Sequence, residues 1–280
     1  MKSSSSEKKE FKIYPRKRFS QNFLINLKAA RRIVDYLDLE PGQKVLEIGP
    51  GKGVLTKYLL EKKAKVFGVE LDRDLCKYLE EEFRDNNNLK VINQDILKFD
   101  LKKLAEKEGN LKIIGNLPYQ ITSPILEYLI QSSEVIDSAI LTVQKEVAKR
   151  ICARPDTSDW STLSIGVQLF SNPEILFILK PNSFHPAPKV DSAVLRLEFL
   201  SIPKAKVELP FFSNLVKALF SSRRKNLLNG LSKALNWDKT KVKTLLEKTG
   251  IEEKRRAETL SLEELAGLAR LISEKSEQIV

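Results

Sequence analysis

QKVLEIGPGKG, residues 43–53, is the stretch of the 280-residue chain that decides its fold. Val45, Leu46 and Ile48 form a short apolar run, and glycines at positions 49, 51 and 53 follow it. From residue 54 to residue 60, apolar residues recur at helical spacing. A strand, a glycine turn and a helix in this order predict the first unit of an α/β fold.

Apolar runs and helical patterns continue to alternate as far as residue 200. Further strands are predicted at 65–71, 89–93, 111–115, 138–143, 174–179 and 192–200. An acidic helix is predicted from residue 72 to about 84, and an amphipathic helix at 124–131. This alternation is typical of a mostly parallel sheet with helices on both faces, which binds its ligand at the carboxyl ends of the strands.

Beyond residue 203 the pattern becomes purely helical. Amphipathic helices are predicted at 211–220, 224–235, 239–248 and 261–275, with no strand between them. Ser261 and Glu264 are spaced for a capping box, and Leu260 and Leu265 for its hydrophobic staple. We therefore predict a flexible basic tail over residues 1–15, an α/β domain over 16–203 and a small all-helical domain over 204–280.

Composition excludes several classes of protein. Cys76 and Cys152 are the only cysteines, which excludes a disulfide scaffold and leaves no CxxC pair. His185 is the only histidine, so Cys/His zinc sites and a Ser-His-Asp triad are excluded as well. The longest uncharged stretches are too short to span a bilayer, and the Ser- and Lys-rich start lacks the apolar segment of a signal peptide. We expect a soluble, cytoplasmic protein without a metal site.

The net charge of +11 is unevenly distributed along the chain. Residues 1–18 carry seven basic and two acidic side chains, and residues 201–280 carry sixteen and ten. Between these ends the 25 basic and 25 acidic residues cancel. A neutral body with basic ends suggests a site flanked by surfaces for a polyanion, nucleic acid before membrane. Lysines that serve only solubility are the alternative explanation.

The glycine turn indicates the kind of cofactor. A dinucleotide-binding GxGxxG turn would need a third glycine where Val54 or Thr56 stands. Glycines spaced by twos after Glu47 are instead typical of the nucleoside-binding turn of S-adenosylmethionine-dependent methyltransferases. Glu70, ending the second strand, is placed to accept both ribose hydroxyls, and Asp95, ending the third, to accept from the adenine amino group. Three suitable strand ends in succession disfavour the alternative of an ordinary tight turn with solvated carboxylates.

The fourth strand ends at Asn116-Leu117-Pro118-Tyr119, which resembles the (D/N/S)-P-P-(Y/F) element of methyltransferases that modify exocyclic amines. The Asn116 oxygen and the backbone carbonyl of Leu117 or Pro118 can accept the two N–H bonds of such an amine and aim its lone pair at a methyl sulfonium. Tyr119 can stack on the base, which must be unpaired or flipped to reach it. Phe184 is a candidate for the second face of an aromatic sandwich, with core packing as an equal alternative.

Eight motifs together resemble the rRNA adenine N6-dimethyltransferase family. They are RFSQNFL at 18–24, EIGPGKGVLT at 47–56, GVELD at 68–72, NQD at 93–95, GNLPYQITSP at 115–124, FHPAPKVDSAV at 184–194, LFSSRRKNLLNGL at 219–231 and RRAETLSLEELAGL at 255–268. The resemblance runs from about residue 16 to residue 272. It implies a Rossmann-like methyltransferase sheet with a seventh, antiparallel strand, a small C-terminal helical domain, and S-adenosylmethionine as the cofactor.

The resemblance also assigns roles to single residues. Asn116 and Tyr119 are assigned to the target base, where Leu117, Pro118 and Phe184 complete the predicted catalytic set. Its cofactor-binding residues are Gln21, Asn22 and Leu24 at the methionine end and, around the rest of the molecule, Gly49, Gly51, Glu70, Leu71, Asp95, Ile96 and Asn116.

Two branches of this family compete. The small-subunit branch dimethylates two adjacent adenosines in the 3′-terminal hairpin of small-subunit rRNA during subunit biogenesis, whereas the antibiotic-resistance branch modifies one adenosine of large-subunit rRNA. NLPY, the 184–194 loop and SSRRKNLLNGL resemble the small-subunit branch, so we predict a monomeric enzyme that acts on the immature small ribosomal subunit. A non-catalytic assembly factor is disfavoured by the intact site motifs, and a DNA adenine methyltransferase by the lack of a target-recognition domain.

Two basic clusters are candidates for RNA binding. They are Arg16, Lys17 and Arg18 near the start, and Arg223, Arg224 and Lys225 in the helical domain. On a continuous helix Arg224 would interrupt an apolar stripe, so we expect the helix to break near Ser221 and Ser222 and the cluster to lie near the RNA. Phosphate contacts from such residues position RNA without reading its sequence.

Overall fold

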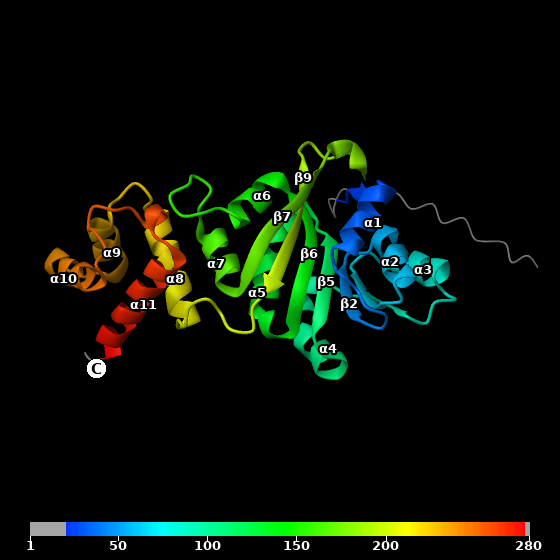
Figure 1. The fold of residues 1–280 in the computed structure, drawn as a ribbon, viewed down its shortest axis with the longest axis horizontal. Coiled ribbons are helices and arrows are strands. Elements are labelled where there is room, and N and C mark those ends of the chain that lie inside the picture. Colours follow the sequence, from blue (N-terminus) through cyan, green and yellow to red (C-terminus); the bar gives the residue numbers. More distant parts are fainter. Residues whose placement is uncertain (1–20, 278–280) are drawn as a thin grey trace, which may run out of the picture.

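A computed structural model describes residues 21–277 and is built on a seven-stranded sheet (Figure 1). Its strands are β2 (Lys44–Ile48), β3 (Lys65–Glu70), β4 (Leu89–Asn93), β5 (Leu111–Asn116), β6 (Ile136–Gln144), β7 (Ser171–Leu179) and β9 (Ser192–Phe199). Each coincides with a predicted strand. The order in the sheet is β4-β3-β2-β5-β6-β9-β7, and β9 runs antiparallel to both of its neighbours. The seventh, antiparallel strand is therefore confirmed.

Helices cover both faces of this sheet. On one face lie α1 (Leu27–Asp35) and α2 (Val54–Glu61); on the other lie α4 (Leu101–Glu108), α5 (Thr122–Gln131), α6 (Lys145–Ile151) and α7 (Thr162–Phe170), while α3 (Arg73–Glu82) joins β3 to β4. Successive residues of β5 show why: Ile113 packs into one core cluster and Ile114 into the other, both fully buried. Strands covered on both faces read as continuous apolar runs, which is how the sequence predicted them.

A second, two-stranded sheet joins the start of the described chain to the proline-rich loop. In it β1 (Phe23–Leu24) runs antiparallel to β8 (Phe184–His185). The amide of Ile25 extends the contact by donating to the Ser183 carbonyl at 2.8 Å. The segment that follows Asn22 is thereby fixed beside the sheet's carboxyl edge. Strands of two residues show no sequence period, which is why neither was predicted.

The chain beyond β9 forms helices α8 (Leu209–Ser221), α9 (Leu227–Leu235), α10 (Lys239–Thr249) and α11 (Leu262–Glu277). The predicted break near Ser221 and Ser222 is confirmed. Helix α9 begins three residues later than predicted, because the side chain of Asn226 caps it by accepting from the Asn229 amide at 3.0 Å. The capping box is also confirmed: Glu264 accepts from the Ser261 amide at 2.8 Å, and the Ser261 hydroxyl accepts from the Glu264 amide at 3.2 Å.

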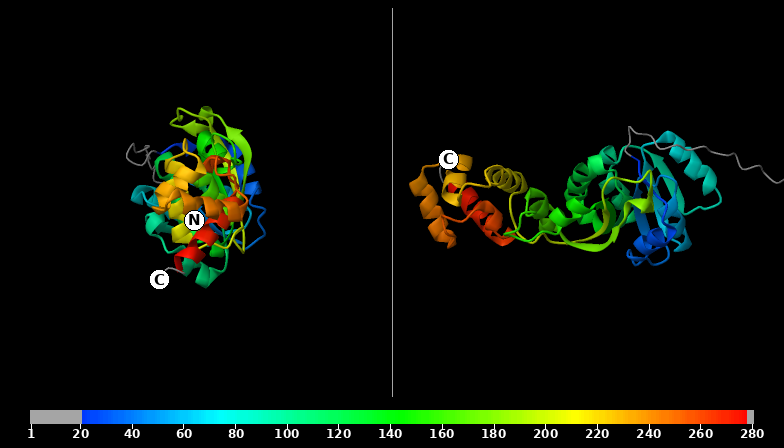
Figure 2. Two further views of the ribbon diagram at one scale, coloured as in Figure 1. Left: turned by 90° about the vertical axis from the view of Figure 1, so that its left-hand side faces the viewer. Right: turned by 90° about the horizontal axis from the view of Figure 1, so that it is seen from above.

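The helical region and α7 share one buried core. Trp160 and Phe170 belong to the same apolar cluster as Leu215 and Leu265, and the Trp160 indole donates to the Leu260 carbonyl at 3.1 Å. The molecule is elongated, with this region at one end and α2 and α3 at the other (Figures 1 and 2). The predicted domain boundary after residue 203 stays a prediction. No helix of the described chain has both the length and the apolar character needed to cross a bilayer.

Candidate functional site

The carboxyl ends of β2, β3, β4 and β5 surround a pocket of about 1040 Å³, including its mouth, which opens to solvent. Among its lining are Gln21, Asn22, Leu24, Gly49, Gly51, Glu70, Leu71, Asp95, Ile96, Asn116, Leu117, Pro118 and Tyr119. These are all the residues that the sequence predicts for the cofactor, together with the whole NLPY element. Parallel strands explain the convergence, since their carboxyl ends meet at one edge of the sheet.

The glycine turn forms one wall of the pocket. Gly49, Gly51 and Gly53 have φ angles of 63°, 59° and 73°, which residues with a Cβ rarely adopt. A Cβ at Gly49 would meet no atom within 4 Å, whereas one at Gly53 would lie 2.6 Å from the ring of Phe83. The first glycine therefore leaves space in the pocket, and the last lets the end of α3 pack against the turn.

The carboxylate of Glu70 is held rigidly in this pocket. One oxygen accepts from the Gly51 amide at 3.1 Å and the other from the Asp72 amide at 2.9 Å. Burial raises the pKa of Glu70, because a charged carboxyl loses water there, and the two amides oppose the shift. Asp95 is fixed in the same way, since it accepts from the Leu97 amide at 3.0 Å. Both carboxylates keep lone pairs that can accept further hydrogen bonds.

Glu47 is a pocket residue to which the sequence assigned no role. Its side chain is 1% exposed and accepts from the Thr56 hydroxyl at 2.6 Å. Burial raises the pKa of its carboxyl to about 7, against the lowering effect of that hydrogen bond. The EIGPGKG motif places Glu47 directly before the glycines, so its position near the pocket could be predicted. The burial of its side chain could not, because burial depends on how the helices and strands pack. Phe23 and Lys52, from two of the motifs, also line the pocket.

Asn116 joins the cofactor side of the pocket to the NLPY element. Its side-chain nitrogen donates to the Asn22 carbonyl at 2.8 Å, so the amide is oriented and its oxygen is the atom that can accept from a ligand. The Pro118 carbonyl already accepts from the Ile121 amide at 3.1 Å and the Thr122 hydroxyl at 3.2 Å. Of the two backbone carbonyls considered for the target amine, that of Leu117 is therefore the better acceptor.

Tyr119 is anchored to the antiparallel strand. Its phenol oxygen lies 2.7 Å from the hydroxyl of Ser192, the first residue of β9. Burial raises the pKa of Tyr119. The half-buried ring lines the pocket, and the hydrogen bond restricts it to one orientation. A flat base that enters the pocket would meet a fixed aromatic face.

Phe184 lies elsewhere than the sequence predicts. It is 3% exposed, pairs with Leu24 in the small sheet and packs in the apolar cluster that contains Leu37 and Val194. It does not contribute to the pocket lining, so the proposed second face of an aromatic sandwich is corrected to core packing. The reason is the pairing of β1 with β8, which sets Phe184 into this apolar cluster.

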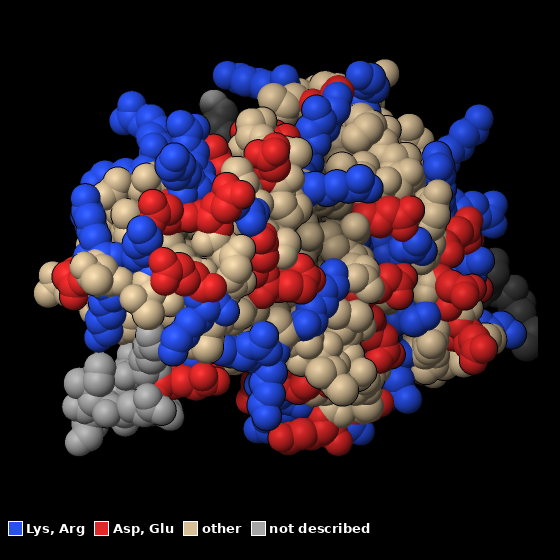
Figure 3. Space-filling view, turned by 60° about the vertical axis from the view of Figure 1, so that its left-hand side comes forward, with Lys and Arg blue, Asp and Glu red and all other residues tan. Residues whose placement is uncertain are grey.

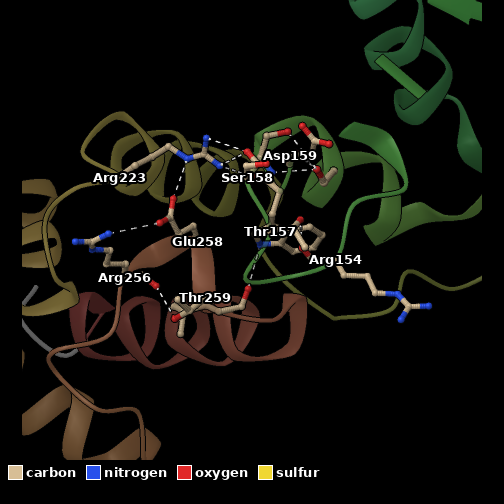
Figure 4. Close-up of polar contacts among 12 residues, drawn as sticks. Arg154, Thr157, Ser158, Asp159, Arg223, Arg256, Glu258 and Thr259 are labelled. Carbon is tan, nitrogen blue, oxygen red and sulfur yellow. Dashed lines mark hydrogen bonds and ion pairs between the residues drawn. The ribbon is translucent and has the colours of Figure 1, made fainter. Parts of the chain in front are cut away.

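The three basic residues after α8 differ in their surroundings. The Arg223 guanidinium donates to the carbonyls of Trp160 and Ser158 and lies 3.4 Å from the Glu258 carboxylate, as Figure 4 shows for its labelled partners. Arg224 and Lys225 are exposed. Arg223 therefore joins the loop before α7 to the segment before α11, and the RNA-binding assignment of this cluster stays a prediction that fits Arg224 and Lys225 better.

Charge on the neighbouring surface is mixed. Figure 3 shows basic side chains crowded over part of the face that includes the helical region, with acidic ones between them. The predicted contacts of Arg16, Lys17 and Arg18 lie outside the described residues. Within residues 21–277 no group of three His, Cys, Asp or Glu side chains is arranged to hold a metal ion.

Comparisons with known proteins agree with this geometry. The model of a family described as ribosomal RNA adenine dimethylase matches residues 14–272. Two proteins named ribosomal RNA small subunit methyltransferase A are similar over almost their whole length. The one from Clostridium botulinum (strain ATCC 19397 / Type A) is 42% identical over 266 residues, which are 95% of this chain and 96% of that protein. The one from Alkaliphilus metalliredigens is 45% identical over 262 residues, 92% and 91%.

Two solved structures share the fold over most of the chain. A dimethyladenosine transferase from Plasmodium falciparum superposes with a TM-score of 0.78 at 26% identity, covering 91% of this chain and 98% of that one. The 23S rRNA methyltransferase ErmE superposes with a TM-score of 0.69 at 27% identity, covering 90% and 100%.

Proposed function

The chain belongs to the ribosomal RNA adenine dimethylase family, and from that membership we propose which adenosines it modifies and how its residues act. It is an S-adenosylmethionine-dependent rRNA adenine N6,N6-dimethyltransferase. The proposed substrate is a pair of adjacent adenosines in the 3′-terminal hairpin of small-subunit rRNA, modified while the subunit matures. The observation that supports this best is Asn116, which lines the pocket and whose side-chain nitrogen donates to the Asn22 carbonyl, so that its oxygen is the atom left to accept from the target amine.

The residues of the pocket fit the cofactor. Space beside Gly49 and the fixed carboxylates of Glu70 and Asp95 suit a nucleoside, with Glu70 accepting from the ribose and Asp95 from the adenine amino group. Leu71, half exposed at the mouth, and Ile96, buried beside Asp95, offer apolar surface to the adenine ring. Bound S-adenosylmethionine supplies an electrophilic methyl group on a sulfonium.

The target amine needs activation, because its lone pair is delocalised into the adenine ring. The Asn116 oxygen and the Leu117 carbonyl are proposed to accept its two N–H bonds, which draws the nitrogen toward tetrahedral geometry and exposes the lone pair. Tyr119, held by Ser192, stacks on the flipped base and limits its tilt. In each transfer the N–CH3 bond forms as the S–CH3 bond breaks, the sulfonium leaves as a neutral thioether, and the methylated nitrogen releases one proton to solvent. After the first transfer only one N–H remains, so one of the two acceptors must give way to the methyl group.

The small subunit is the proposed target for a specific reason. The relatives that share 42–45% of their residues with this chain over nearly its full length are named for the small subunit. ErmE, named for 23S rRNA, shares the fold at 27% identity and represents the second candidate function. Action as a monomer and in the cytoplasm is part of the proposal, and the rRNA substrate supports the second of these.

Asn116→Ala tests the catalytic assignment. We expect turnover to fall by about 100-fold or more, as when a preorganised polar group is removed from an active site, while cofactor binding, to which Asn116 also contributes, should weaken far less when measured by calorimetry. Asn110→Ala is the matched control, since Asn110 is an exposed asparagine just before β5 and Asn116 ends that strand. The readout is primer extension on immature small subunits, which stops at dimethylated adenosines.

Three results would overturn parts of the proposal. Wild-type rates from Asn116→Ala would remove Asn116 from the chemistry. Stops confined to large-subunit rRNA would favour the second candidate function. No stops with either RNA, despite tight RNA binding, would favour an assembly factor without methyl transfer.

A further inference from the structure

Three charged side chains meet beside the pocket, outside the residues used so far. Lys145 begins α6, Lys180 follows β7, and Asp191 precedes β9. One oxygen of Asp191 lies 3.2 Å from the Lys145 ammonium and 3.1 Å from that of Lys180. The Lys145 amide also donates to the Asp191 carbonyl at 3.0 Å, which ties the start of α6 to the same point. We call these three residues the lysine pair site.

The lysine pair site is next to the position proposed for the target base. Ser192 pairs with Gln144 of β6 and with Leu179 of β7. Asp191, Lys145 and Lys180 are the chain neighbours of these three paired residues and lie beyond them at the same end of the sheet. The hydroxyl of Ser192 lies 2.7 Å from that of Tyr119. Consecutive Cα atoms are about 3.8 Å apart, and Asp191 lies one residue from Ser192, whose hydroxyl holds the Tyr119 ring.

The acidic residues of the pocket make positive charge at this place favourable for RNA binding. Glu70 and Asp95 line the pocket, and negative charge on their carboxyl groups repels the phosphate groups that flank any nucleotide inserted there. Two lysines against one aspartate leave the lysine pair site with a net positive charge. Each ammonium has three N–H donors, so bonding to Asp191 leaves donors for a further acceptor. The Lys180 side chain is 70% exposed and that of Lys145 39%, so both are open to solvent.

We propose that Lys145 and Lys180, held side by side by Asp191, bind a phosphodiester group of the RNA next to the target adenosine. This inference rests on the proposed function, and it adds a substrate-binding site to that function. Lys145 and Lys180 contact the phosphate, and Asp191 positions them. The contact fixes the backbone on which the flipped base turns, so that the base meets Tyr119 and Asn116 in one orientation.

Charge reversal at Lys180 tests the site. Lys180→Glu should raise KM for the immature small subunit about 10-fold or more and leave KM for S-adenosylmethionine unchanged. The slope of log K for RNA binding against log[salt] should become less steep by about 0.7–0.9, which corresponds to the loss of one phosphate contact. Lys180→Arg should stay within about twofold of wild type. Lys63→Glu is the matched control, because Lys63 is an exposed lysine in the turn before β3, at the opposite edge of the sheet.

The outcomes separate this site from a simple tie between strands. If Lys180→Glu shows the same KM for RNA and the same salt dependence as Lys63→Glu, the proposal is wrong and the ion pairs only join α6, β7 and β9. If Lys180→Glu unfolds more easily than wild type, Lys180→Ala serves instead, since it places no second carboxylate beside Asp191. RNA binding is measured without cofactor, so that it is tested separately from methyl transfer. If the wild-type protein binds the hairpin through Lys180 but methylates other RNA, the proposed function is wrong and this site is supported.

Discussion

Replacing Glu47 by glutamine should remove a pH dependence from the stability of the fold. The buried carboxyl has its pKa raised from 4.5 to about 7, chiefly because burial penalises its charge. Between these values the folded protein binds a proton that the unfolded chain releases. The stability that this proton contributes is therefore fully present below pH 4.5 and is lost as the pH rises through about 7.

The magnitude follows from the size of the shift. One pKa unit corresponds to 1.36 kcal/mol, so wild-type protein should lose about 2.5 kcal/mol of unfolding free energy between pH 5 and pH 8 through this group. Urea denaturation at the two pH values measures the loss. Glu47→Gln keeps an oxygen for the Thr56 hydroxyl but cannot ionise, so its difference between the two pH values should be smaller by that amount.

Glu106→Gln is the control for this experiment, because Glu106 is an exposed carboxyl on α4. It should follow the wild-type pH dependence. If Glu47→Gln follows it too, Glu47 is already ionised in the folded protein at neutral pH, and the reasoning from its burial fails.

Three further experiments test the description of the core and the turn. Phe184→Ala should lower the free energy of unfolding by about 3–5 kcal/mol, and Phe184→Leu by less while keeping KM for RNA; a folded leucine variant that no longer binds RNA would restore Phe184 to the base pocket. Thr142→Val should raise the urea midpoint by the equivalent of about 1–2 kcal/mol, because the buried Thr142 hydroxyl has no hydrogen-bond partner among the described residues; an unchanged midpoint would contradict this. Gly53→Ala should lower stability by about 1–3 kcal/mol through its clash with Phe83, whereas Gly49→Ala should weaken cofactor binding measured by calorimetry; equal stability losses without a binding defect would refute the distinction.

Much of the fold could be predicted from sequence because local and global signals agree. The seven strands are apolar runs in the sequence. Turn residues and helix caps such as Asn226 mark where the strands and helices begin or end. The meeting of the predicted cofactor residues in one pocket has a simpler reason. Once the strands are known to be parallel, Glu70, Asp95 and Asn116 must meet, because Glu70 and Asn116 end strands at the same edge and Asp95 follows the end of β4 by two residues.

What sequence could not supply is the direction and depth of single side chains. Phe184 reads equally well as a core residue or a stacking ring, and only the pairing of β1 with β8 decides between them. Arg223 and Arg224 are adjacent and chemically identical, yet only Arg223 turns inward to backbone carbonyls. In the sequence Glu47 appears as part of a loop motif. In the structure its side chain is buried, because α2 packs against β2.

The core that the helical region shares with α7 limits how this enzyme can be divided or recombined. A chain cut after β9 would leave Trp160 and Phe170, now covered by helices from the other side of the cut, facing water. Grafting the helices of a relative onto this catalytic half would meet the same obstacle unless the graft carried a matching partner for α7. Substitution of exposed residues such as Arg224 and Lys225, which lie outside this core, avoids that obstacle. Sequence drift in α7 should track drift in α8 and α11.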